Sequence, residues 1–401
     1  MKKFENYAAN LNNPKWNYMI KRETPLYSRE NDLRNEFQRD YTRIIHSNAY
    51  KRLKHKTQVF FSPENDHICT RIEHVTLVES ISYTIADYLG LNTELTKAIS
   101  IAHDLGHSPF GHVGEKILSD LSEKDVGFKF WHEKNGLNFV DNIELLEDNN
   151  RNYRNLNLTY AVRDGIISHC GEISENELKP RDQYIDLNDY NYPNQYSPYT
   201  WEACVVKISD KISYIYRDII DAIELGILDE KLDELYDLLE INKSENIINN
   251  TTVLNTLIKD LCENSTPEKG LCFSNKALNL INKIKKFNYE NIYTSKRIQP
   301  SNRFFEVVIK EIYYLLKSTY EDTNTLKNIE KFKRIYPKLY ESFTSFINNY
   351  YDIKNREDLK LKNKVLFSFK NEKDFYKSII YFIAGMTDNF AIEIYKEIIK
   401  F

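Results

Sequence analysis

Glycine and proline are scarce in this chain. Its 401 residues include 11 glycines and 10 prolines, together about 5%, whereas average proteins contain about 12%. Turns depend on these residues and helix interiors reject them, so their scarcity argues against an all-β fold. Apolar residues make up 41% and charged residues 28% of the chain, which is typical of a globular protein. We therefore expect an all-α globular protein.

Cysteines are also few, and none of them forms a CxxC motif. An odd number of widely spaced thiols excludes a disulfide scaffold and a thiolate zinc knuckle, and it suits a reducing compartment. The five are Cys69, Cys170, Cys204, Cys262 and Cys272.

Long apolar runs and a strong excess of one charge are absent as well. No segment of 18 or more apolar residues occurs, and the first 16 residues contain no apolar signal-peptide core. The formal net charge of −4 excludes a uniformly basic coat for nucleic acid. We expect a cytoplasmic protein with no membrane partner.

The pattern along the chain divides it into three regions. Residues 1–40 are polar and predict an irregular and partly helical arm. Residues 41–226 carry every motif with recognisable chemistry and form the expected core. Residues 227–401 have mostly helical periodicity without such a motif, and we expect them to pack on that core. Apolar residues recurring every three or four positions predict helices over 71–89, 93–105, 158–170 and 201–225.

Most of the histidines lie in the first third of the chain, up to just beyond the second of these helices. Seven of the nine fall between residues 46 and 112. His103 and Asp104 are adjacent at the end of helix 93–105, where they could offer a ring nitrogen and a carboxylate oxygen to one metal ion. His74 lies near the start of helix 71–89. A tight turn joins the two helices, so they should pack antiparallel and bring His74 beside His103 and Asp104.

Asp210 is the candidate fourth ligand, because it interrupts the apolar surface of helix 201–225. Burying an unpaired carboxylate is costly, so a cation partner is expected. Two imidazoles and two carboxylates suit one divalent ion, namely Mn, Fe, Co, Ni, Zn or, less well, Mg, and do not choose among them. Taken alone, His74 could be an ordinary core histidine and Asp210 could pair with Lys207 or Lys211. The hypothesis depends on the joint pattern.

Longer motifs around these residues resemble a known family. The chain is similar to the HD-domain phosphohydrolases and, more narrowly, to the deoxyguanosine triphosphate triphosphohydrolase family. The resemblance covers about residues 39–226. The motifs are RDYTRIIHSNAYKRLKHKTQVF (39–60), RIEH (71–74), HDLGHSPFGHVGE (103–115), LNLTYAVRDGIISHCGE (156–172), PRDQYIDL (180–187) and PYTWEACVVKISDKISYIYRDIIDAI (198–223).

The resemblance implies a reaction and its catalytic residues. A deoxynucleoside triphosphate (dNTP), either dGTP or several dNTPs, plus water would give a deoxynucleoside and inorganic triphosphate. The metal ligands would be the same four residues. His112, supported by Glu115, would be the catalytic pair near the α-phosphate, and His107 and His132 would line the phosphate site. Spacing does not decide which histidine is the general acid, and His107 and His112 could instead support the ligands.

The resemblance also implies the residues that bind substrate. A triphosphate carries about four negative charges, so cations should converge on it. Arg71 lies one helical turn before His74 and on the same face. Phosphate contacts would come from Arg71, Lys211 and Tyr214, although Lys211 could equally be a solvated cation. Asp218 would face the sugar, Gln58 would read the 3′-hydroxyl, and Tyr214 could exclude a ribose 2′-hydroxyl.

Two further partners follow from less specific signals. A basic run could form a site for an activating nucleotide or for single-stranded nucleic acid, or it could be a solvated helix face. Members of the resembled family tend to oligomerise, so we expect a homo-oligomer. The run comprises Arg43, Lys51, Arg52, Lys54, His55 and Lys56.

Two alternative functions remain open at this point. Another HD-type phosphohydrolase, acting on nucleoside monophosphates, cyclic dinucleotides or alarmones, would share the four ligands but need not have the His112 to Glu115 segment. A non-catalytic nucleic-acid-binding scaffold would be expected to lack ligands and to have a basic surface. All four ligands are present, and the net charge of −4 does not favour a basic surface.

Overall fold

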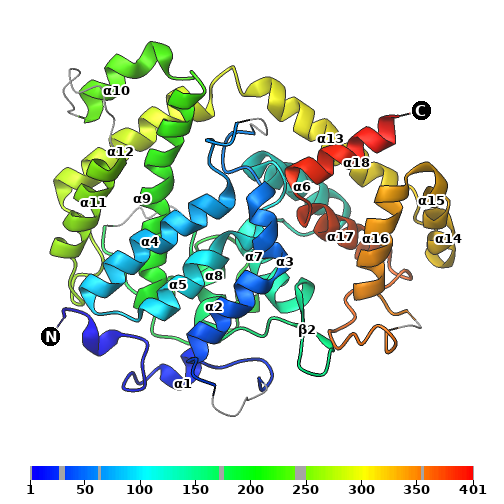
Figure 1. Ribbon diagram of the computed structural model, residues 1–401, viewed down its shortest axis with the longest axis horizontal. Coiled ribbons are helices and arrows are strands. Elements are labelled where there is room, and N and C mark those ends of the chain that lie inside the picture. The colour runs from blue at the N-terminus through cyan, green and yellow to red at the C-terminus, as the bar shows by residue number, and fades with distance from the viewer. Residues whose placement is uncertain are drawn as a thin grey trace.

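Helices dominate the computed structural model, as the sequence predicts (Figure 1). It describes residues 2–26, 32–61, 65–170, 176–239, 250–353 and 356–400. The single sheet among these residues is a two-stranded antiparallel hairpin of β1 (Leu145–Glu147) and β2 (Tyr153–Asn155), with Leu146 opposite Arg154. The expected all-α class is therefore confirmed.

The N-terminal residues lie along the lower edge of the molecule in Figure 1 and are anchored by aromatic side chains. Phe4 is fully buried and packs edge-on against Trp201, with ring centroids 4.9 Å apart. A capping box of Asn35 and Gln38 starts the first long helix. The elements of this part are η1 (Glu5–Tyr7), α1 (Trp16–Met19), α2 (Glu36–His46), α3 (Asn48–Arg52) and η2 (Leu53–His55).

The centre of the molecule is built on the helices that the apolar periodicity predicts. Gly90 ends α4 with a left-handed φ of 87°, and Asn92 caps α5, so the two helices run antiparallel. The α-helix expected to reach residue 105 ends at Ala102 and tightens into a 3-10 turn, η3. These elements are α4 (Arg71–Leu89), α5 (Thr93–Ala102), η3 (His103–Gly106), α6 (Gly111–Asp125), α7 (His132–Asn138), the π-helix η4 (Phe139–Ile143), α8 (Tyr160–Ser168), η5 (Leu187–Asp189) and α9 (Trp201–Glu224).

The C-terminal helices cover this centre on two sides. In Figure 1, α11 and α12 lie on the left against α9, and α13 to α18 lie on the right near α6. Their bounds are η6 (Asp229–Lys231), α10 (Leu232–Leu239), α11 (Asn250–Asn264), α12 (Asn275–Asn288), the π-helix η8 (Tyr289–Tyr293), α13 (Gln299–Lys317), η9 (Asp322–Asn324), α14 (Thr325–Glu330), α15 (Phe332–Ile335), α16 (Pro337–Tyr350), α17 (Glu372–Ala384) and α18 (Asp388–Ile399).

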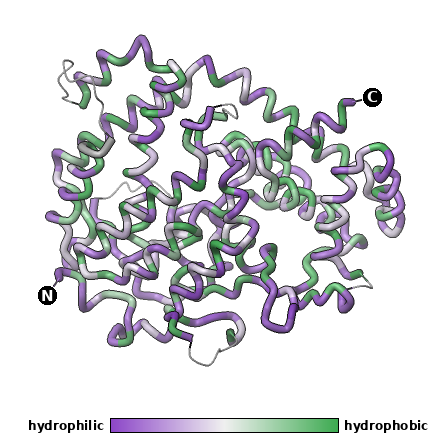
Figure 2. Tube along the Cα trace, in the orientation of Figure 1, coloured by the Kyte–Doolittle hydropathy of each residue, from purple (hydrophilic) through white to green (hydrophobic). Residues whose placement is uncertain are grey.

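The buried apolar side chains form three clusters. One joins α4 and α9 to α11 and α12, a second joins α6 to α13, α16, α17 and α18, and a third lies among α2, α5 and α8. Hydrophobic and hydrophilic residues alternate along most helices (Figure 2), as expected when each helix buries one face. In the part of the chain that the structure describes, no helix combines the length and the apolar character that crossing a bilayer requires.

Candidate active site

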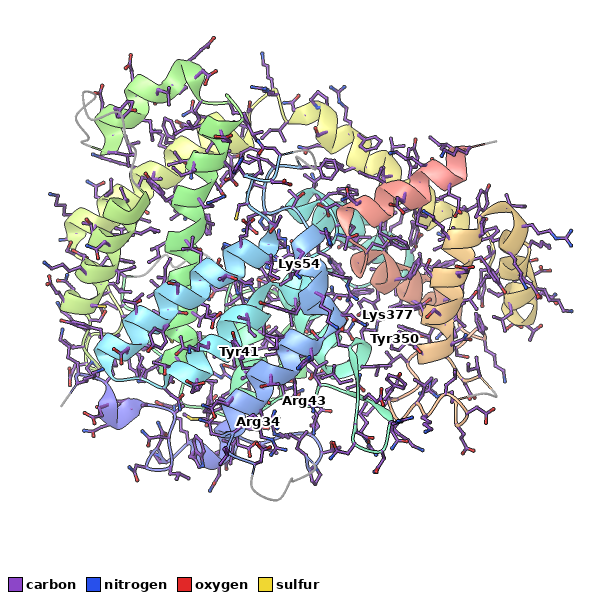
Figure 3. All side chains as sticks on the ribbon, in the orientation of Figure 1. Arg34, Tyr41, Arg43, Lys54, Tyr350 and Lys377 are labelled. Carbon is purple, nitrogen blue, oxygen red and sulfur yellow. The ribbon has the colours of Figure 1, made fainter. Side chains whose placement is uncertain are left out.

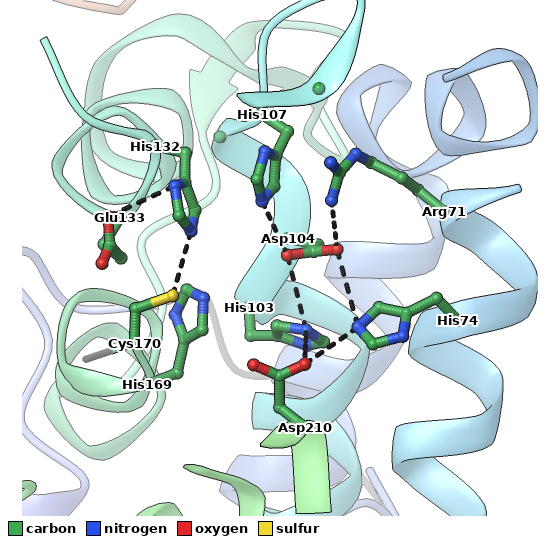
Figure 4. Close-up of polar contacts among 12 residues, drawn as sticks. Arg71, His74, His103, Asp104, His107, His132, Glu133, His169, Cys170 and Asp210 are labelled. Carbon is green, nitrogen blue, oxygen red and sulfur yellow. Dashed lines mark hydrogen bonds and ion pairs between the residues drawn. The ribbon is translucent and has the colours of Figure 1, made fainter. Parts of the chain in front are cut away.

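Four predicted ligands converge where the first turn of α4 meets η3 and the middle of α9 (Figure 4). Asp210 Oδ1 lies 3.0 Å from His74 Nε2 and 3.7 Å from His103 Nε2. Asp104 Oδ1 lies 3.4 Å from His103 Nε2, and Asp104 Oδ2 lies 3.9 Å from His74 Nε2. One donor atom each from His74, His103 and Asp210 falls within 4.8 Å of the others. The antiparallel packing of α4 and α5 brings these groups together as expected.

The hydrogen bonds of His103 make one ring nitrogen available. His103 Nδ1 lies 2.6 Å from the carbonyl oxygen of Ser100, which can only accept, so this nitrogen carries the proton. The lone pair of the neutral ring is therefore on Nε2, which is buried and has no hydrogen-bond partner. Buried polar atoms rarely lack a partner, and a second nitrogen fixed by a backbone carbonyl is typical of metal-ligating histidines. The donor set fits a divalent cation.

The charges at the site reinforce each other. Burial lowers the pKa of His74, but its hydrogen bond to Asp210 and the charge of Asp104 outweigh burial and leave the pKa raised. Burial raises the pKa of Asp210, and the hydrogen bond with His74 outweighs it and leaves the pKa lowered. Arg71 Nη1 lies 2.8 Å from Asp104 Oδ2 and fixes that carboxylate from the opposite side. Two ionised carboxylates thus face a common point.

A row of imidazoles extends from the four ligands toward the surface. His107 Nε2 lies 3.1 Å from Asp104 Oδ1, and the His107 ring stacks on His132 with centroids 3.8 Å apart. Gly106 allows this approach, since a Cβ on it would lie 2.0 Å from the His132 carbonyl oxygen. The predicted His112–Glu115 contact is present at 3.4 Å, and the His112 side chain is 76% exposed.

Glu115 makes its shorter contacts with His132. Its carboxylate accepts from the His132 backbone N–H at 2.9 Å and lies 3.0 Å from His132 Nδ1. Burial lowers the pKa of His132, but Glu133 and Glu115 outweigh it and hold the pKa well above its usual value. Burial and the charge of Arg71 hold the pKa of His107 well below its usual value. The two stacked rings therefore favour opposite protonation states.

The other predicted substrate residues come from the segment before α4 and from α9. Gln58 Oε1 is buried without a hydrogen-bond partner, and Lys211 and Tyr214 are half-buried on α9. Asp218 is buried and accepts a hydrogen bond from the Tyr293 hydroxyl of η8. Burial raises the pKa of Asp218 to about 7. Tyr293, from the C-terminal half, was not foreseen, because no motif marks it.

A side-chain carboxylate from the C-terminal helices also reaches the loop that carries His107 and precedes His112. Asp388, the first residue of α18, accepts from the Phe110 N–H at 2.9 Å and from the Thr57 N–H at 2.8 Å. Phe110 has a φ of 63°, a conformation that a bulky residue adopts only when its surroundings impose it. Buried Lys56 donates to the carbonyl oxygens of His107 and Ala384. The C-terminal helices therefore hold this loop.

His169 and Cys170, at the end of α8, also lie beside the predicted site. The His169 ring centroid is 4.9 Å from that of His103, and Cys170 Sγ lies 3.3 Å from His132 Nε2. Neither residue was predicted as a site residue from the sequence. The available signal was a His-Cys pair at the end of a predicted helix, inside one of the resembling motifs.

The basic run is divided between structural and exposed residues. Arg43 donates to the Leu156 carbonyl oxygen, Arg52 pairs with Glu144, and Lys56 is buried as described above. Arg43 and Lys54 lie toward the two ends of the run (Figure 3). The exposed members are Lys51, Lys54 and His55.

Comparisons with known proteins agree with the geometry. A family model described as HD domain matches residues 71–215. A deoxyguanosinetriphosphate triphosphohydrolase-like protein of Caldanaerobacter subterraneus is 33% identical over 367 residues, covering 92% of this chain and 86% of that protein. Proteins with the same description from Rickettsia bellii and Pelagibacter ubique are each 32% identical, over 91% and 93% of this chain and 92% and 96% of their own. The chain belongs to the deoxyguanosinetriphosphate triphosphohydrolase-like family of HD-domain hydrolases.

Proposed function

We propose that this protein is a metal-dependent dNTP triphosphohydrolase, which converts dGTP or several dNTPs to the deoxynucleoside and inorganic triphosphate. The observation that carries the proposal is the convergence of two histidines and two aspartates beside a row of imidazoles. The family of the chain supports the substrate class, because its relatives are described as deoxyguanosinetriphosphate triphosphohydrolase-like.

One divalent cation would be held by His74, His103, Asp104 and Asp210. When bound, such a cation polarises a phosphoryl group and lowers the pKa of water. His103 would bind through Nε2, the nitrogen without a hydrogen-bond partner. Arg71 keeps Asp104 oriented and, at the same edge of the site, provides a charge for a phosphate oxygen.

The chemistry is an attack of water on the α-phosphorus. The water oxygen bonds to phosphorus, the bond from phosphorus to the 5′-oxygen breaks, and its electron pair goes to that oxygen, which takes up a proton. His112 is the proposed donor, because it lies at the exposed end of the row and Glu115 orients its ring. His107 and His132 would contact the phosphate, His107 from beside Asp104 and His132 from beside Glu115.

The remaining predicted residues would hold the other phosphates and the sugar. Lys211, directly after Asp210, and Tyr214, one turn further along α9, would face the phosphates, with Tyr214 as a barrier to a 2′-hydroxyl. Gln58 has a buried oxygen ready to accept from the 3′-hydroxyl, and Asp218 would face the same group. A hydrogen-bonding site of this kind rejects a sugar that leaves its polar groups unpaired.

The test is a panel of dNTPs and ribonucleoside triphosphates, incubated with Mn²⁺ or Mg²⁺ and analysed for products. We expect inorganic triphosphate from the wild-type protein and none above background from Asp210→Asn. Asp120→Asn, an exposed carboxylate on α6, is the matched control and should retain full activity. Release of pyrophosphate or monophosphate would instead assign the site to another HD-type reaction.

Two partners are proposed on less specific grounds, the basic run for the first and the resemblance for the second. The exposed residues Lys51, Lys54 and His55 would bind an activating nucleotide or single-stranded nucleic acid, and the chain would form a homo-oligomer. Repeating the dNTP panel with a second nucleotide, and measuring the mass of the particle in solution, tests both.

A further inference from the structure

A second group of metal-binding side chains lies next to the four ligands. It consists of His132, His169 and Cys170, each of which has a donor atom within 4.8 Å of the other two. Cys170 Sγ lies 3.3 Å from His132 Nε2. In Figure 4 the sulfur of Cys170 lies between the rings of His132 and His169. None of the three is among the predicted metal ligands.

The outer nitrogens of both rings are occupied, which leaves the inner ones available as ligand atoms. His169 Nδ1 lies 2.7 Å from the Ile166 carbonyl oxygen, so that nitrogen carries the proton. His169 is 2% exposed, and its Nε2 has no hydrogen-bond partner. His132 Nδ1 is held by Glu115 at 3.0 Å. Carboxylate and carbonyl partners of this kind are what orient histidines around a metal.

The backbone at Cys170 is held in place by a neighbouring helix. Lys207 on α9 donates to the carbonyl oxygens of Cys170, at 2.6 Å, and of Ser168, at 3.1 Å. These bonds give hydrogen-bond partners to carbonyl oxygens at the C-terminal end of α8, and they fix the backbone that carries the thiol. Glu133, whose carboxylate lies 3.4 Å from His132 Nδ1, adds negative charge beside the cluster.

We propose that His132, His169 and Cys170 form a second metal site, which takes a thiophilic divalent cation of the Zn²⁺ type. Tetrahedral zinc with bonds of about 2.0–2.1 Å to nitrogen and 2.3 Å to sulfur places neighbouring donor atoms about 3.5 Å apart. The measured sulfur-to-nitrogen distance of 3.3 Å is close to this value. A thiolate with two imidazoles selects zinc over Mg²⁺ or Mn²⁺, in contrast to the nitrogen and oxygen donors of the four-ligand site.

Binding at this site is coupled to loss of a proton. A cysteine binds zinc as the thiolate, so a bound cation displaces the proton from the Cys170 sulfur. Zinc affinity at this site should therefore fall as the pH is lowered. Under the proposed function, a cation on His132 would also withdraw that ring from the phosphate and inhibit hydrolysis.

Cobalt(II) provides the test, because it substitutes for zinc and gives an intense charge-transfer absorption in the near ultraviolet only when sulfur is a ligand. Metal-free protein titrated with Co²⁺ should show this band, and Cys170→Ser should lose it. Cys272→Ser, a buried thiol outside the cluster, is the matched control and should keep the band. His169→Gln should weaken Co²⁺ binding at this site at least tenfold, and thermal unfolding of each variant verifies that it is folded.

The variant His74→Ala distinguishes binding at the four-ligand site from binding at this second site. That variant should lose hydrolysis and one bound cation per chain but keep the sulfur-to-cobalt band. A band missing from the wild-type protein, or one that survives in Cys170→Ser, would overturn the second site. Because the band does not depend on turnover, it would remain if the proposed hydrolysis failed.

Discussion

Asp388 connects the start of α18 to the histidine loop, and Asp388→Asn tests what this connection contributes to turnover. The carboxylate accepts two backbone N–H groups, from Phe110 and Thr57, and the amide can accept only one of them. The other N–H would face the new NH₂ group. A hydrogen bond to a charged group contributes about 1.5–3 kcal/mol. We therefore expect the variant to lose about 2–3 kcal/mol of interaction between α18 and the loop.

The consequence should appear in turnover more than in metal content. A loss of 2–3 kcal/mol makes displaced forms of the loop about 30–150 times more populated relative to the native form. His107 and His112 flank Phe110, whereas His74 lies on α4 and Asp210 on α9. We expect the kcat for triphosphate release to fall at least tenfold while the bound cation is retained.

The assay measures kcat, the metal content and the urea midpoint of wild type, Asp388→Asn and Asn389→Ala. Asn389 is adjacent but exposed, so its variant should match the wild type in all three. A kcat within twofold of wild type in Asp388→Asn, with the variant folded, would refute the claim that this carboxylate positions the catalytic loop.

Three further predictions concern single side chains of the site. His74→Ala and Asp104→Ala should lose activity together with one bound cation, and unchanged metal content in both would refute the ligand assignment. His112→Ala should keep the cation and lose about 100-fold or more in turnover, as expected for a general acid; near-normal turnover would transfer that role to another histidine of the row. Asp218→Asn should change the pH dependence of stability. Burial raises the pKa of this carboxyl from 3.8 to about 7, so charging it destabilises the folded protein as the pH rises through this range. Urea unfolding should show the variant gaining stability over wild type above pH 7 and losing that advantage below pH 4; an advantage independent of pH would contradict the assignment.

The helices and the approach of His74 to His103 and Asp104 were predictable because their determinants are local. Apolar periodicity specifies α4, α5 and α9, and the turn at Gly90 sets the antiparallel pairing of the first two. Once these helices pack, the first turn of α4 and the end of α5 must meet, and the ligands meet with them. The change to a 3-10 turn after Ala102 was not predictable from periodicity, because it depends on contacts of η3 with α7.

The remaining features depend on contacts between residues far apart in sequence. Asp388 and Phe110 are separated by 278 residues, and the Tyr293 and Asp218 pair by 75. No local pattern shows which carboxylate a backbone N–H will meet after folding. The partner of Glu115 was likewise not predictable, although the residues concerned are closer in sequence. The spacing of Glu115 from His112 suggests a pair, but the packing of α7 on η3 brings His132 closer to the same carboxylate.

Hydrolysis in ¹⁸O-labelled water tests the central claim most directly, because the label reports which bond the site breaks. If the four ligands and the row of histidines direct water to the α-phosphorus, phosphorus-31 NMR should find the label on a terminal phosphate of the released triphosphate, and the deoxynucleoside should contain none. Label in the 5′-hydroxyl of the nucleoside, or label in pyrophosphate or a nucleoside monophosphate, would contradict the account.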